Sequence, residues 1–227
     1  MDSVSANRRG AAVDLAIAIG FFFVCYLSEP RLDPILRHGR GLAMAFATAA
    51  YQFGFEGLAP LTIMAVRRER FSDYGFTRRG TAKSVAMALV LAVAYDLGMS
   101  WHAGAWLWIP MRRQPAIRMS LDAGFPACLA GLAATVAAWG FFEGFFGVFF
   151  ARKLNAALGR SGRGWLSPGA LGFAFFNGLI HLTVGQGVEG FVASFASGYA
   201  IAVIPAVTGN SWGSALVQTL TDAVGKR

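Results

Sequence analysis

Apolar residues run through this chain in long blocks, which short polar and basic segments separate. A helix of about 20 apolar residues is long enough to cross the hydrocarbon core of a bilayer. The pattern therefore predicts an all-α, polytopic transmembrane helical bundle of about seven spans in a single integral membrane domain. The predicted spans are residues 11–27, 41–66, 84–99, 123–151, 165–184, 191–207 and 211–224. The charged segment 29–40, the Trp-rich segment 100–118 and the basic segment 152–163 are predicted to be loops.

Composition supports a membrane class. Hydrophobic residues make up 56% of the 227 residues and charged residues only 14%, whereas a soluble domain usually has about 25% charged residues. The net charge of +8 could indicate nucleic acid, but the basic residues lie between apolar runs, as they do at the interfacial ends of membrane helices. We therefore expect contact with a lipid bilayer and no nucleic-acid partner.

Basic residues also predict an orientation. The first apolar run ends in Ser-Glu-Pro without a small-x-small cleavage site, which favours an uncleaved first span. Seven spans with a cytoplasmic amino terminus put 12 of the 20 Lys and Arg residues on the cytoplasmic side, as the positive-inside rule expects. We predict an integral protein of a bacterial inner membrane.

The segment 137–152, AAWGFFEGFFGVFFAR, has one acid, Glu143, inside an apolar run. On a helix, its small residues share one face and most of its Phe residues the opposite face. Small residues let helices approach closely, while the Phe face meets lipid or fills space between helices. A carboxylate here costs about 2.5–3.5 kcal/mol or more, so Glu143 is a candidate functional residue.

Further polar residues could join Glu143. His181 lies four residues after Asn177, and Asp222 four after Gln218, so each pair shares a helix face. Three spans could thus bring Glu143, His181, Gln218 and Asp222 to one buried point. A carboxylate that activates water beside an imidazole is sufficient in principle for peptide-bond hydrolysis.

From residue 72 to 224 the chain resembles the CPBP intramembrane proteases. They are also called the CAAX-protease and bacteriocin-processing family and are relatives of the CAAX prenyl endopeptidase. The resemblance lies in SDYGFTRRG, EGFFGVFFARKL, FAFFNGLIHL and GYAIAVIPAVTGNSWGSALVQTLTDAV. The family's motifs are Glu-Glu-x-x-x-Arg, Phe-x-x-x-His and His-x-x-x-Asn. The resemblance implies that Glu143 activates water and that His181, Gln218 and Asp222 position it and the oxyanion.

The motif positions are only partly retained. Glu143 and His181 match the family. At the other positions the chain has Gly144 for glutamate, Val148 for arginine, Asn177 for phenylalanine, Gln218 for histidine and Asp222 for asparagine. One His and one or two carboxylates form an incomplete ligand set. No cofactor is predicted, and a divalent metal stays an open alternative.

Three functions follow. The first is an intramembrane endopeptidase, or a degenerate descendant of one, that acts on a membrane-associated peptide or protein. The second is a catalytically inactive membrane partner or immunity-type protein with the same bundle. The third is a small-molecule transporter that uses Glu56, Asp96 and Glu143 as a proton or cation path. It ranks last because no inverted repeat or pair of broken helices is visible. Glu56, before Pro60, is interpreted as a residue that caps or lines a helix break.

Overall fold

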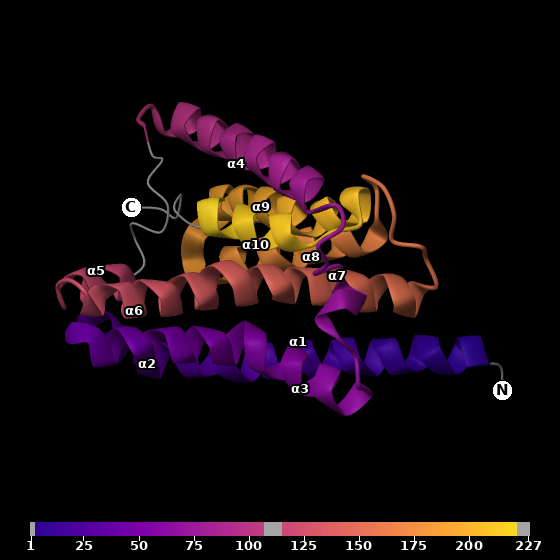
Figure 1. Ribbon diagram of the computed structural model, residues 1–227, viewed down its shortest axis with the longest axis horizontal. Helices are drawn as coiled ribbons and strands as arrows, with labels where there is room; N and C mark the ends of the chain where they lie inside the picture. Colours follow the sequence, from indigo (N-terminus) through magenta and orange to yellow (C-terminus); the bar gives the residue numbers. More distant parts are fainter. Residues whose placement is uncertain (1–2, 107–114, 222–227) are drawn as a thin grey trace.

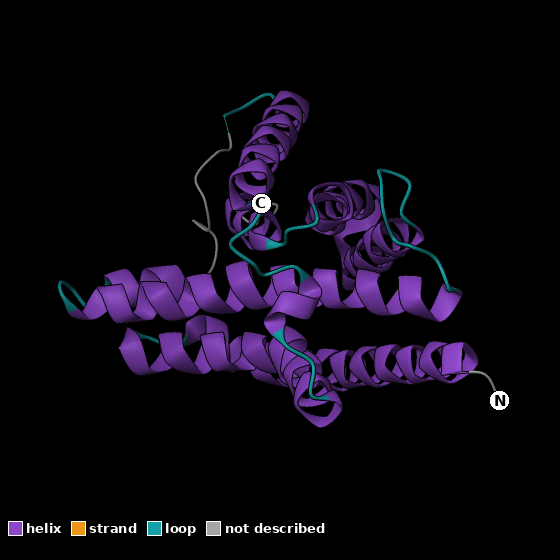
Figure 2. Ribbon diagram, turned by 45° about the vertical axis from the view of Figure 1, so that its right-hand side comes forward, coloured by secondary structure: helices purple, strands orange, loops and turns teal. Residues whose placement is uncertain are grey.

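The computed structural model describes residues 3–106 and 115–221, and these residues form helices and connections with no strand among them (Figures 1 and 2). The all-α prediction is confirmed over this part of the chain. In chain order the elements are α1 (Ser3–His38), α2 (Gly41–Phe53), η1 (Gly54–Leu58), α3 (Ala59–Arg67), η2 (Phe71–Tyr74), α4 (Thr81–Ala103), α5 (Pro115–Leu121), α6 (Ala127–Thr135), η3 (Val136–Phe142), α7 (Glu143–Leu158), α8 (Pro168–His181), η4 (Leu182–Gln186), α9 (Gly187–Thr208) and α10 (Trp212–Thr221).

Four helical stretches are long and apolar enough to cross a membrane, which indicates a membrane protein. They are Asn7–Ser28, Thr81–Ala103, Ala127–Leu158 and Gly187–Thr208. The other three predicted spans are helical over much of their length but do not meet this criterion within the described residues. The number seven therefore stays a prediction.

Three segments predicted as loops contain helix. Helix α1 continues to His38 through the charged segment, α5 begins in the Trp-rich segment, and α7 continues to Leu158. Hydropathy locates only the apolar part of a helix. A helix satisfies most of its backbone hydrogen bonds internally, so it can continue with polar side chains.

Helix α7 is the centre of the bundle. In Figure 1, α1, α2 and α3 lie on one side of the continuous α6–η3–α7 helix, and α8, α9 and α10 lie on the other, with α4 outermost. Phe145, Phe146 and Phe149 on α7 are each at most 1% exposed. The Phe face therefore fills space between helices, one of the two roles that the sequence left open.

One end of the bundle collects many basic segments. Here the connection between α3 and α4 is attached to the turn between α9 and α10, because Asn210 Nδ2 donates to the carbonyls of Thr77 (2.7 Å) and Arg79 (3.0 Å). The Ser211 hydroxyl donates to the Tyr74 carbonyl at the same place. We call this end, with the start of α1, the ends of α3, α7 and α9, and the starts of α4, α8 and α10, the basic end.

Candidate functional site

Glu143 lies beside a second buried carboxylate. The side-chain amide of Gln52 donates to Glu56 Oε2 at 2.9 Å and reaches Glu143 Oε2 at 3.4 Å. Glu56 is only 8% exposed, and Glu143 is partly buried. One amide nitrogen therefore bridges two carboxylates that are far apart in the sequence.

Two π-helical segments bring this pair together. Glu56 is inside η1, and Glu143 directly follows η3. Their flanks pack closely, with the rings of Phe53 and Phe142 4.7 Å apart. A Cβ at Gly57 would lie 3.1 Å from the Phe142 ring, so glycine permits the approach. Single-turn π segments inside α-helices occur frequently at functional sites.

The helix is not broken near Glu56. Helices α2, η1 and α3 follow without interruption through Pro60, and Glu56 accepts a hydrogen bond from Gln52 instead of capping a helix end. The interpretation of Glu56 as a helix cap is therefore wrong, whereas its place in the π segment next to Gly57 and Pro60 agrees with a residue that lines a local irregularity of the helix. A common signal could have linked the two acids, because each precedes a glycine within an apolar run of its own, as Glu56-Gly57 and Glu143-Gly144.

A bridged carboxylate pair has a definite chemical capacity. Two carboxylates that share one donor can divide the acid and base roles between them when one of them holds a proton. Such a state provides a general acid and a general base side by side. The side-chain amide of Gln52 holds one oxygen of each carboxylate beside the same donor.

The position after Glu143 has no room for a side chain. A Cβ at Gly144 would lie 2.9 Å from both Ala215 Cα and the Ser214 carbonyl oxygen on α10. These are backbone atoms, which cannot rotate away. Val148, which stands at the position of the family's arginine, is 3% exposed and belongs to the apolar core. The close contacts of α7 thus require a glycine at position 144 and suit an apolar side chain at position 148.

His181 is on the helix next to Glu143. Gly147 on α7 faces Phe173 on α8, and Gly169 on α8 faces Ala151 on α7, because a Cβ at either glycine would touch the other residue. The two helices therefore run antiparallel, and these two contacts fix their register. By this register Glu143 is level with Asn177, and His181 lies one turn, about 6 Å, further along α8. The Nδ1 atom of His181 is 3.1 Å from Gln186 Oε1.

The remaining predicted site residues have separate positions. Asn177 Nδ2 donates to the Ser194 carbonyl at 2.9 Å and so connects α8 with α9. Gln218 is 3% exposed on α10, which contacts α7. Asp222 lies outside the described residues. Glu143, His181 and Gln218 are thus on α7, α8 and α10. The sequence analysis did not assign Gln52 to the site, and it grouped Glu56 with Glu143 only in the transporter alternative.

Asp96, the third acid of the transporter alternative, is on another layer. It is 5% exposed and continues a buried row of small residues on α4 that begins with Ser84, which contacts Gly213. One of its carboxylate oxygens, Oδ1, has no hydrogen-bond partner in the described part of the chain. Because α4 packs on α9 and α10 (Figure 1), Asp96 does not belong to the carboxylate pair.

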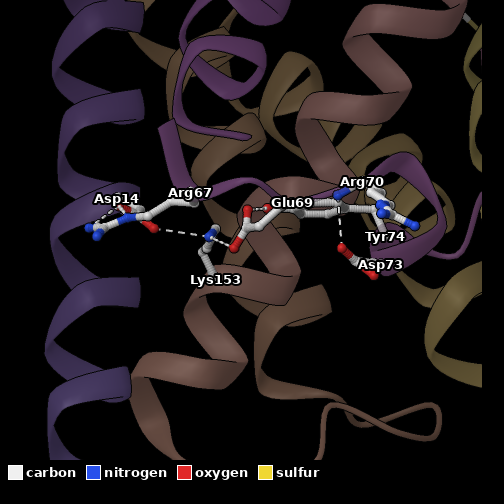
Figure 3. A network of polar contacts seen from close by, with 7 residues as sticks. All are labelled: Asp14, Arg67, Glu69, Arg70, Asp73, Tyr74 and Lys153. Carbon is white, nitrogen blue, oxygen red and sulfur yellow. Dashed lines mark hydrogen bonds and ion pairs between the residues drawn. The ribbon is translucent and has the colours of Figure 1, made fainter. Parts of the chain in front are cut away.

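A second polar cluster fixes α7 at the basic end (Figure 3). Arg67 donates to Asp14 Oδ1 through Nε (3.0 Å) and Nη2 (2.8 Å). Lys153 donates to Asp14 Oδ2 (2.9 Å) and to Glu69 Oε1 (2.7 Å), and the Tyr74 hydroxyl donates to Glu69 Oε2. Asp14 and Lys153 are 4% and 6% exposed. The cluster joins α1, α3 and α7, although the sequence analysis assigned Lys153 to a loop.

Two members of this cluster outside the candidate spans have shifted pKa values. The hydrogen bond and charge of Asp14 raise the pKa of Arg67, which therefore stays a cation. Burial, followed by the hydrogen bond to Glu69, raises the pKa of Tyr74 far above its usual range. The phenol is therefore a stable donor, and the cluster serves a structural purpose.

The described residues contain no group of three or more His, Cys, Asp or Glu side chains that could hold a metal ion. No protein-family model matches the chain, and neither a curated protein nor a solved structure matches it. The candidate site is therefore interpreted from its own geometry.

Proposed function

We propose that this protein is a glutamate-dependent intramembrane endopeptidase of the CPBP type that cleaves a membrane-associated peptide or protein. The observation that carries the proposal is the bridge of Gln52 between Glu56 and Glu143. It supplies two carboxylates and a fixed donor inside an apolar bundle. The resemblance of EGFFGVFFARKL and FAFFNGLIHL to the family motifs supports the same function.

In this proposal Glu143 is the general base. It takes a proton from a water molecule, the resulting hydroxide attacks the scissile carbonyl carbon, and the C–N bond breaks as the leaving amine receives a proton from the carboxyl group that holds one. Glu56 is the partner carboxyl, and Gln52 keeps the pair in place. His181 and Gln218, from α8 and α10, support the developing oxyanion.

The proposed topology has about seven spans in a bacterial inner membrane, with the basic end in the cytoplasm. The alternation of helix starts and ends at the basic end supports this topology, because each successive long helical segment reverses direction. The same end carries Arg67 and the other basic residues around the α3–α4 connection, as the positive-inside rule expects.

The test compares cleavage by matched variants. Purified protein in liposomes is given a panel of peptides anchored by one apolar helix, and products are identified by mass spectrometry. We expect Glu143→Gln to reduce cleavage by about 100-fold or more, as loss of a general base does, and Glu56→Gln to reduce it less. Glu189→Gln, at an exposed acid, is the control and should cleave like the wild type. Equal cleavage by the Glu143→Gln variant would remove Glu143 from the mechanism.

The packing of Gly144 favours a second candidate, a catalytically inactive membrane partner. Helix α10 contacts α7 at Gly144, the position of the family's second glutamate, so closely that no side chain fits there. If the wild type cleaves no peptide and both wild type and Glu143→Gln retain the same membrane protein on co-purification, this second function replaces the first.

A further inference from the structure

A cavity at the basic end, away from the carboxylate pair, is lined by three arginines. The cavity has a volume of about 400 Å³ and lies between the end of α7, the connection from α7 to α8, and the end of α9. Arg152, Arg160 and Arg163 line it together with Ser161 and Tyr74. This volume is in the range of small-molecule sites in proteins.

These three arginines have no carboxylate partner among the described residues, because the nearby acids bind elsewhere. Asp14 pairs with Arg67 and Lys153, and Glu69 pairs with Lys153. Arg152 is held by an aromatic contact instead, with its guanidinium carbon 5.4 Å from the centre of the Tyr74 ring. The cavity therefore has a surplus of positive charge.

Buried hydrogen bonds hold the connection that carries Arg160 and Arg163. Asn155 Oδ1 accepts from the backbone N–H of Gly169 (2.8 Å), and its Nδ2 donates to Ser167 Oγ (3.1 Å). Asn155 and Ser167 are 9% and 1% exposed. The backbone N–H of Gly164 also donates to the Ala206 carbonyl on α9 (2.9 Å). The cavity is thus formed before any ligand binds.

The floor of the cavity differs from its rim. Val148, Ala151 and Ala202 form an apolar inner wall, whereas the arginines and Ser161 lie toward the end of the bundle. Planar guanidinium groups bind phosphate oxygens through two parallel hydrogen bonds. An apolar wall beneath such a rim suits a phosphate group that carries a small organic substituent.

We propose that this cavity binds a phosphate monoester or diester through Arg152, Arg160 and Arg163. The phosphate comes either from the headgroup of an anionic lipid or from a soluble phosphate compound. The site does not use Glu143 and is independent of the proposed peptidase activity. It assigns a ligand-binding function to the basic end of the bundle.

The experiment measures binding to the full chain in two forms. In neutral detergent, inorganic phosphate and glycerol 3-phosphate are titrated, and the thermal unfolding midpoint is recorded. In nanodiscs, phosphatidylcholine is compared with phosphatidylcholine that contains phosphatidic acid, and retained lipid is counted by native mass spectrometry. Saturable binding of the soluble probes identifies a soluble ligand, and selective retention of phosphatidic acid identifies a lipid headgroup.

Matched variants separate a built site from general surface charge. Arg160→Gln with Arg163→Gln should weaken binding by about tenfold or more, since each charge-assisted hydrogen bond is worth a similar factor. Arg78→Gln with Arg79→Gln removes the same charge from exposed residues at the same end outside the cavity and should change binding less than about twofold. Ser161→Glu, which puts a carboxylate at the rim, should weaken binding in the same way if the first variant does not fold. The proposal would be overturned if the two double variants lost binding affinity equally, or if no probe bound saturably.

Discussion

Lys153 and Asp14 form an ion pair of 2.9 Å although they are 139 residues apart and each side chain is at most 7% exposed. The pair connects the central helix α7 to the first helix of the chain. Each charge has a further partner, because Arg67 also binds Asp14 and Glu69 also binds Lys153. A buried charge that loses its partner is costly, so this cluster determines how α1 packs on α7.

Lys153→Met is expected to destabilise the protein by about 3 kcal/mol, because it leaves Asp14 and Glu69 with fewer cationic contacts in a buried place. Unfolding in mixed micelles with increasing SDS measures the change. Asp14→Asn combined with Lys153→Met should cost less than the sum of the single changes, since the amide that replaces the carboxylate of Asp14 carries no charge that needs the missing ammonium group. Additive losses would contradict a direct coupling.

Gly144→Ala is expected to destabilise the bundle by about 1–3 kcal/mol, because the new Cβ would overlap backbone atoms of Ala215 and Ser214. Gly98→Ala is the control. Gly98 is exposed on α4 with nothing within 4 Å of a Cβ, so alanine there should be neutral or stabilise by up to about 1 kcal/mol through helix propensity. The same SDS titration applies, and equal effects at both glycines would disprove the close contact of α7 with α10.

Gln52→Leu is expected to destabilise the protein by about 1–3 kcal/mol, because it removes the donor that bridges two carboxylates. The loss should be smaller when Glu56 is already changed to Gln. A double-mutant cycle of Gln52→Leu and Glu56→Gln should therefore give a coupling energy of about 0.5–3 kcal/mol. A coupling energy near zero would show that the bridge does not stabilise the fold.

Tyr74 predicts a specific alkaline effect. Burial and the hydrogen bond to Glu69 raise the pKa of Tyr74 above the ordinary tyrosine value of 10.0. The folded state therefore holds this proton more tightly than the unfolded state does. The resulting stability is complete below pH 10 and is lost progressively as the pH rises above it.

The measurement for Tyr74 is the unfolding free energy of wild type and Tyr74→Phe between pH 8 and about pH 12. The difference between the two curves should decline above about pH 10, since the variant has no phenol to ionise. Tyr26→Phe, at a tyrosine whose hydroxyl contacts Thr183, is a control for the general effect of high pH. A constant difference across the range would show that Tyr74 ionises alike in the folded and unfolded states.

Much of the fold could be predicted from local patterns. The apolar runs locate the helices that contain Phe22, Ala88, Phe146 and Ile201, because burial of apolar residues in long helices follows directly from hydropathy. Helix ends were less predictable. The end of α7 at Leu158 lies beyond the apolar run, since Lys153 and Asn155 are buried there through specific hydrogen bonds.

The candidate site was only half predictable. Glu143 stands out in an apolar run, and its importance could be inferred from the cost of burying a lone acid. The hydrogen bond from Gln52 could not be predicted, because it joins residues that are 91 positions apart. Glu56 was grouped with Glu143 only in the transporter alternative. The family motifs directed attention to His181 and Gln218 on later helices, whereas the hydrogen bond from Gln52 to Glu143 comes from α2.

The sequence by itself determined that this is a helical membrane protein, that its basic residues concentrate between apolar runs, and that Glu143 is an unusual acid within an apolar run. These are properties of single residues and their near neighbours in the chain. The tertiary structure decided which helices meet, and so paired Glu143 with Glu56, Lys153 with Asp14, and three arginines with one cavity. Helix hydropathy is the same whichever neighbour a helix has, and close packing at glycines such as Gly57 and Gly144 selects among the possible partners.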